Sequence, residues 1–143
     1  MNSEIERLMQ KYPIAFKNAQ DAEFWNIPDG WVALLDNLFS EVNELLKESY
    51  DKFPATEDES GFSILQIKEK FGGLRIYFGF ISEDSYTIEK IQSLIDQAED
   101  KSYDICQLTG TPGTLCIKNH HYMTLCESVR KEMGYHTIPG TKD

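Results

Sequence analysis

The sequence predicts an α+β domain built around a β-hairpin, and three stretches of the chain support this. Residues 62–81, FSILQIKEKFGGLRIYFGFI, contain two runs of β-forming residues that meet at Gly72-Gly73. A glycine pair suits a two-residue hairpin turn because glycine adopts positive φ angles at little cost. Residues 31–46 and 88–98 instead place apolar side chains at helical spacing. An isolated hairpin is only marginally stable, so we expect these two amphipathic helices to cover its apolar face.

The composition is that of a folded, acidic domain. The chain has 143 residues, of which 41% are hydrophobic, and a net charge of -10, which disfavours general binding to a nucleic-acid backbone. No apolar run approaches the roughly 20 residues that cross a bilayer, and the N-terminus lacks a signal-peptide pattern, so we expect a cytoplasmic protein with no membrane partner. The chain has 3 cysteines, all in its last third. An odd number grouped in this way indicates reduced thiols or a metal site.

The hairpin is expected to have one apolar and one cationic face. With Gly72-Gly73 as the turn, Phe71 lies opposite Leu74 and Lys70 lies opposite Arg75. Like charges directly across a ladder repel, so something should neutralise the cationic face. The predicted apolar face, which is core, consists of Leu65, Ile67, Phe71, Leu74, Ile76, Phe78 and Phe80.

Three helices are expected around the hairpin. The first covers residues 3–12, and the longest runs from Asp29, which acts as its N-cap, to about residue 50. The aromatic pair Phe24-Trp25 either fixes a loop to the core or lines a pocket. Residues 82–85 supply a turn and a cap for a helix that ends near residue 103.

The C-terminal third has a different character. Glycines and a proline in CQLTGTPGTLC force a turn between Cys106 and Cys126, and ESVRKEMGY is a short helical segment. We divide the single domain, residues 1–143, into a helical and hairpin core at 1–104, a tail at 105–135 and a flexible end at 136–143.

Three blocks of the sequence resemble one family. PDGWVALLDNLFSEV, QIKEKFGGLRIYF and ICQLTGTPGTLCIKNHHYMTLC, in this order, look like a widespread but functionally uncharacterised family of small bacterial and phage proteins. The middle block is that family's signature. Its last block is similar to a zinc knuckle of the type C-x-x-C-G-x-P-G followed, after a spacer, by T-L-C-x-x-H or C.

This chain departs from the zinc pattern at two positions. Cys106 and Cys126 match the first and third ligands, but Thr109 stands at the second position and Val129 at the fourth. A structural zinc needs four ligands, so the resemblance implies a degenerate, zinc-knuckle-like tail that holds no metal and is kept together by packing. Cys116 and His120 are the weak candidates, beside the two matching cysteines, for completing a metal site; His121 adjoins His120 and points in a different direction on most backbones.

The cationic face of the hairpin is the best candidate binding site. Lys68, Lys70 and Arg75 supply two point charges and a forked donor, and Tyr77 adds a stacking surface. Turn amides at Gly72 and Gly73 can approach a ligand closely. A small anionic, nucleotide-like ligand would satisfy this group, whereas the alternative is that carboxylates of the acidic stretch 21–59 pair with the same cations.

No catalytic constellation is evident from the sequence. We find no nucleophile with its base, no paired carboxylates and no phosphate-binding loop, so a non-catalytic binding protein is the leading interpretation and a small nucleotide-acting enzyme the weaker one. The family's phage and bacterial setting implies a counter-defence role, either sequestering a defence signal in the host cytoplasm or, through the acidic surface, inhibiting a host or phage protein. An uncovered hairpin edge would also pair with a second copy, which leaves a homo-oligomer open.

Overall fold

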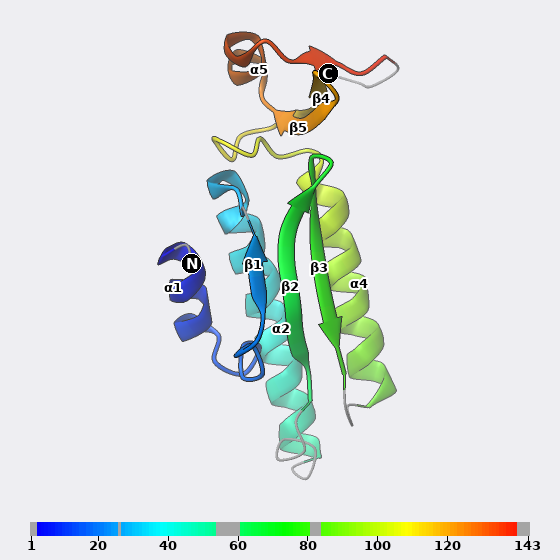
Figure 1. Cartoon of the computed structure of the whole chain (residues 1–143). Coiled ribbons are helices and arrows are strands. Elements are labelled where there is room, and N and C mark those ends of the chain that lie inside the picture. The colour runs from blue at the N-terminus through cyan, green and yellow to red at the C-terminus, as the bar shows by residue number, and fades with distance from the viewer. Residues whose placement is uncertain (1–2, 26, 54–60, 81–83, 140–143) are drawn as a thin grey trace.

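The computed structural model describes residues 3–25, 27–53, 61–80 and 84–139. Its helices and two three-stranded sheets confirm the α+β class (Figure 1). The strand order is β1-β2-β3 in the first sheet and β5-β4-β6 in the second. The elements are α1 (Ser3–Lys11), β1 (Glu23–Trp25), the 3-10 turn η1 (Asp29–Trp31), α2 (Val32–Lys52), β2 (Ser63–Lys70), β3 (Gly73–Gly79), α4 (Ser85–Ser102), β4 (Thr114–Lys118), β5 (His121–Leu125), α5 (Glu127–Met133) and β6 (His136–Thr137).

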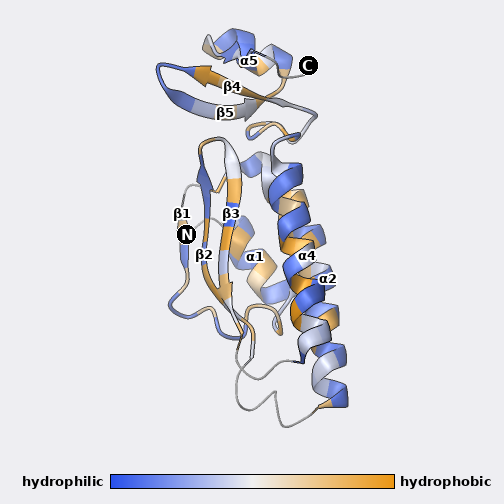
Figure 2. Ribbon diagram, turned by 90° about the vertical axis from the view of Figure 1, so that its right-hand side faces the viewer, coloured by the Kyte–Doolittle hydropathy of each residue, from blue (hydrophilic) through white to orange (hydrophobic). Residues whose placement is uncertain are grey.

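Helices α2 and α4 lie on one face of the first sheet, and no helix of the described chain covers the other face (Figure 2). The sheet includes a strand that the sequence pattern did not predict. β1 pairs with β2 in parallel, with Phe24 opposite Ile67. Parallel neighbours need a long crossover connection, and α2 supplies it between β1 and β2. Phe24 packs against the core. For this residue, the first of the two expected alternatives, fixing the segment to the core, therefore holds.

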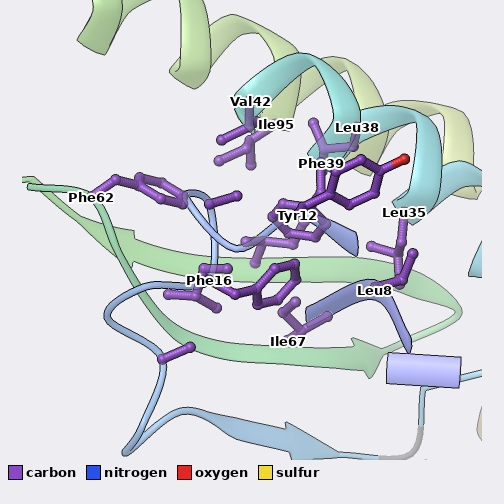
Figure 3. Close-up of a cluster of buried hydrophobic side chains, with 14 of the residues drawn as sticks. Leu8, Tyr12, Phe16, Leu35, Leu38, Phe39, Val42, Phe62, Ile67 and Ile95 are labelled. Carbon is purple, nitrogen blue, oxygen red and sulfur yellow. The ribbon is translucent and has the colours of Figure 1, made fainter. Parts of the chain in front are cut away.

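The main core fills the space between the helices and the sheet (Figure 3). Its largest fully buried side chains include Trp31 and Phe39 from the η1-α2 segment, Ile67 and Leu74 from the hairpin, and Ile95 from α4. Most of the positions whose spacing predicted the two long helices are buried, whereas Leu34, Leu45 and Leu94 are only partly so. The buried ones are Trp31, Leu35, Leu38, Val42, Leu46, Ile91, Ile95 and Ala98.

The register of the hairpin differs from the prediction. Lys70 lies opposite Gly73 and Lys68 opposite Arg75, so the turn consists of Phe71 and Gly72 rather than of the two glycines. Phe71 adopts a φ of 54° in this turn and is 63% exposed. A break in the register between Ile64 and Gln66 turns Ile64 into the core. Leu65 and Phe71 were therefore wrongly assigned to the buried face, and Leu65 is exposed instead.

The caps of the long helices were predicted in one case of two. Asp29 is the first residue of the 3-10 turn and not its N-cap. The N-cap position is Pro28, and no side chain caps this turn. Asp84 does cap α4: its carboxylate accepts hydrogen bonds from the backbone N–H and the hydroxyl of Thr87 and from the Ser49 hydroxyl of α2. Burial alone would raise the pKa of Asp84, but these hydrogen bonds outweigh it and hold the pKa below its usual value.

Neither edge of the hairpin is left open along its centre. β1 pairs with the outer side of β2. On β3, the backbone N–H groups of Leu74 and Ile76 donate to the Ser102 hydroxyl at 2.9 Å and to a Glu99 carboxylate oxygen at 2.9 Å. α4 thereby occupies these two donors of the β3 edge, and a homo-oligomer stays a prediction.

The second sheet and α5 form a C-terminal unit beside the tip of the hairpin (Figure 1). β4 pairs antiparallel with β5 and with β6. His136 and Thr137, which were expected in a flexible end, form β6; residues 140–143 of that end lie outside the described residues. Within the described residues, no helix combines the length and apolar character that a membrane span requires.

Candidate functional site

Lys68, Arg75 and Tyr77 share the outer face of the first sheet, as the sequence predicted. The pairing of Lys68 with Arg75 and of Gln66 with Tyr77, together with the alternation of side chains along a strand, places them opposite the core face. Their partners across the ladder differ from the prediction, which had put Lys70 opposite Arg75. Lys68 Nζ lies 5.5 Å from the centre of the Tyr77 ring, and Tyr77 is 43% exposed. We call Lys68, Lys70 and Arg75 the cationic face.

Within the described residues, Arg75 is held in place by two neutral hydrogen-bond acceptors. Its guanidinium donates to the Tyr103 hydroxyl at 2.7 Å and to the carbonyl of Leu74 at 2.9 Å. Burial raises the pKa of the nearby Glu99 carboxyl, an effect that the N–H of Ile76 and the charge of Arg75 reduce without cancelling. Arg75 is thus a positioned donor with an acidic group in its surroundings.

The ion pairs of the described residues lie elsewhere. They join Arg7 to Glu4, Lys11 to Asp36, and Lys131 to Glu127, and none includes a member of the cationic face. The alternative interpretation would pair these cations with carboxylates of residues 21–59; of these, residues 57–59 lie outside the described residues, and that alternative stays a prediction. Glu23 of that stretch lies on the same face of the sheet, opposite Gln66, which stands two residues before Lys68 on β2.

Gly72 and Gly73 hold the hairpin tip against other parts of the chain and do not face an open site. The Gly72 N–H donates to the Glu69 carboxylate at 2.6 Å, and its carbonyl accepts from the Thr124 hydroxyl at 2.7 Å. A Cβ at Gly73 would lie 2.3 Å from the Tyr103 ring. The Gly72 amide is thus engaged within the chain and both glycines are buried; ligand binding by these two turn residues stays a prediction.

The sequence missed a group of aromatic residues next to the cationic face. Phe71, Tyr103, Leu115 and Tyr122 line an open hollow of about 480 Å³, which we call the aromatic hollow. Phe71 contacts Tyr122 edge to face at 6.3 Å, and Lys70 Nζ lies 5.5 Å from the centre of the Phe71 ring. These residues come from the hairpin turn, the end of α4, β4 and β5, so no local pattern joins them.

The three blocks that carry the family resemblance meet at one junction. Gly30 of the first block donates its N–H to the Gln107 carbonyl at 2.9 Å, and Trp31 Nε1 donates to the Ile105 carbonyl at 3.0 Å. Gln107 in turn bonds Thr124 through its backbone N–H and its side-chain oxygen. Thr124 also binds Gly72 of the middle block. The junction therefore fixes the hairpin tip, and the aromatic hollow with it, against the C-terminal unit.

The positions that would bind zinc in a knuckle lie together, but two of them carry no zinc ligand. The Thr109 hydroxyl is 3.8 Å from Cys126 Sγ, and Val129 packs in the same apolar cluster as Cys106 and Cys126. This donor set does not fit a four-ligand zinc site. No group of three or more His, Cys, Asp or Glu side chains that could hold a metal occurs among the described residues.

The remaining candidates for completing that set are engaged or placed elsewhere. The Cys116 thiol, which is buried, donates to the Thr114 carbonyl at 3.0 Å. His120 is exposed in the turn between β4 and β5, with a φ of 65°. Cys106 is also buried, which leaves Cys126 as the most accessible of the three thiols.

We expect Cys126 to be the reactive thiol of the native chain. Hydrogen bonds from the Val129 N–H, and then from Ser128, Thr109 and Cys106, lower the pKa of Cys126 to about 6. Alkylation by iodoacetamide should therefore reach half its maximal rate near pH 6, and mass spectrometry should find the label on Cys126 alone. Cys106 and Cys116 should react only in denaturant. A midpoint above about pH 8, as for an ordinary thiol, or first labelling of a buried cysteine would contradict this assignment.

Comparisons with protein-family models, curated proteins and solved structures found no match to this chain.

Proposed function

We propose that the chain binds a small anionic, nucleotide-like ligand on its cationic face and that it does so without chemical turnover. The observation that carries this proposal is the gathering of Lys68, Lys70 and Arg75 on one helix-free face of a chain whose net charge is -10, outside every ion pair of the described residues. Three cations in such a setting attract an anion that the rest of the surface repels.

Arg75 is the principal anchor in this proposal. Its contacts with Tyr103 and Leu74 restrict the guanidinium before any ligand arrives, which lowers the entropy cost of binding. A guanidinium donates two parallel hydrogen bonds to a phosphate, and Lys68 and Lys70 add point charges beside it. Tyr77, exposed and next to Lys68, offers a ring face to the sugar or base of the ligand.

The resemblance to bacterial and phage proteins suggests what such binding would achieve. A protein that captures a defence-signalling nucleotide without altering it would lower the free concentration of that signal in the host cytoplasm. This counter-defence role needs tight binding and no catalytic group, which agrees with a site whose proposed ligand contacts are cations and aromatic rings.

Replacing Arg75 by alanine tests the site. Calorimetric titration with a panel of cyclic and linear nucleotides should identify at least one ligand, and Arg75→Ala should weaken its binding by about 10- to 100-fold, the range expected for lost charged hydrogen bonds. Arg7→Ala is the matched control, because Arg7 lies on α1 and pairs with Glu4; it should leave the affinity unchanged.

Three outcomes would count against this function. Failure of every nucleotide to bind would rule out the proposed function. Equal affinity of the wild-type chain and Arg75→Ala would rule out the cationic face as the binding site. Recovery of a chemically altered ligand, seen by mass spectrometry, would instead indicate an enzyme.

A second candidate function, inhibition of a protein through an acidic surface, is favoured by the groove between α2 and α4. Exposed Glu41, Glu44 and Glu48 line one side of this groove of about 380 Å³, and Tyr86, 60% exposed, lies on the other. A basic host or phage protein would complement it. The combined change Glu41→Gln, Glu44→Gln, Glu48→Gln should then abolish co-purification of that partner while Arg75→Ala leaves it intact; the reverse pattern would exclude this candidate.

A further inference from the structure

The aromatic hollow has an unusual construction for an exposed surface. Phe71 is 63% exposed at a φ of 54°, a backbone conformation that bulky side chains rarely adopt. Neither solvent exposure nor the left-handed turn favours phenylalanine over a small polar residue. Its ring nevertheless forms one wall of the hollow, opposite the ring of Tyr122.

The geometry of the rings suits a flat aromatic guest. Phe71 and Tyr122 meet at an interplanar angle of 89°, so a planar ring that stacks on one of them is perpendicular to the other, and stacked and edge-to-face arrangements are both favourable for aromatic pairs.

Two members of the cationic face border the hollow through its own aromatic residues. Lys70 lies beside the ring of Phe71. Arg75 donates to the hydroxyl of Tyr103 at 2.7 Å, and its guanidinium carbon is 5.8 Å from the centre of that ring. An apolar protein segment would leave these charges without a partner. A ligand with a flat ring on one side and phosphate on the other matches both the aromatic rings and the cations.

We propose that the aromatic hollow is the base-binding subsite of the ligand site, so that the ligand is a nucleotide recognised by its base as well as by its phosphate. This inference rests on the proposed function and extends it. The base stacks within the hollow while the phosphate lies between Lys70 and Arg75. Phosphate compounds that lack a base then occupy only half of the site.

The test compares ligands with and without a base on wild-type and variant chains. The probes are the tightest-binding nucleotide of the panel, ribose 5-phosphate and inorganic pyrophosphate. Phe71→Asn removes the ring while asparagine tolerates the positive φ, and Tyr122→Leu keeps an apolar side chain without a ring. Phe53→Asn is the matched control, since Phe53 is 49% exposed at the end of α2.

The inference predicts that both hollow variants weaken nucleotide binding by about tenfold or more, as loss of base stacking does, and leave pyrophosphate binding unchanged. Phe53→Asn should have no effect. If ribose 5-phosphate or pyrophosphate binds as tightly as the nucleotide, or if neither hollow variant weakens the nucleotide, the hollow is not a base subsite although anion capture stands. If no probe binds, the proposed function fails together with this inference.

Discussion

Replacement of Gly30 by alanine is expected to lower the free energy of unfolding by about 2–4 kcal/mol, through overpacking and a lost backbone hydrogen bond. A Cβ at this position would lie 2.0 Å from the Cys106 carbonyl oxygen and 2.7 Å from two backbone atoms of Gln107. These are backbone atoms, so no rotamer change can relieve the clash. The chain must separate Gly30 from Gln107, whose 2.9 Å hydrogen bond joins the η1 turn to the C-terminal unit. Urea denaturation followed by circular dichroism measures the change.

Gly79→Ala is the matched control for this substitution. A Cβ at Gly79 meets no atom within 4 Å, and its φ does not lie in the left-handed region. Alanine there should leave the stability within about 0.5 kcal/mol of the wild type, the usual range for surface substitutions. Equal stability of the two variants would show that the contact between Gly30 and Gln107 does not hold the two units together.

The double substitution Thr109→Cys and Val129→Cys is expected to create a zinc site. With Cys106 and Cys126 it completes two C-x-x-C pairs, the spacing of structural zinc sites. Thr109 already lies 3.8 Å from Cys126 Sγ, and Val129 packs beside that thiol. Free zinc at about 1,000 times its dissociation constant would stabilise the chain by about 4 kcal/mol, which raises Tm by on the order of 10 °C.

Elemental analysis and thermal unfolding together measure this gain. The double variant should carry one zinc per chain, and Cys126→Ser in the same background should lose it. A double variant that folds yet binds no zinc would mean that these four positions do not form a tetrahedral array, and the degenerate-knuckle description of the tail would then be wrong.

The parts of the fold that follow a regular period were predictable, and the irregular parts were not. Helical spacing predicted α2 and α4 with their buried faces. The hairpin was predicted too, but its register depended on assuming that both glycines form the turn. Phe71 occupies the first turn position at a positive φ, and the break after Ile64 turns Leu65 outward. β1, with three residues and a parallel partner remote in sequence, has no period long enough to detect.

The candidate site divides in the same way. Between Gln66 and Tyr77 the error in register moved each residue's partner by two positions, which preserves the alternation of faces; Lys68, Arg75 and Tyr77 were therefore correctly placed together. The aromatic hollow required knowledge of how the hairpin tip docks on the C-terminal unit, because Tyr103 and Tyr122 belong to other elements. The buried contacts of Gly72 with Leu115 and Met123 depend on the same docking.

The most direct test of ligand capture on the outer face of the first sheet is an amide chemical-shift titration of the ¹⁵N-labelled chain with the nucleotide panel. Our account predicts that the amides of residues 66–77 and of Tyr103 shift and saturate, while those of residues 41–48 on α2 do not move. Shifts confined to α2 and α4, or no shift with any nucleotide, would contradict it.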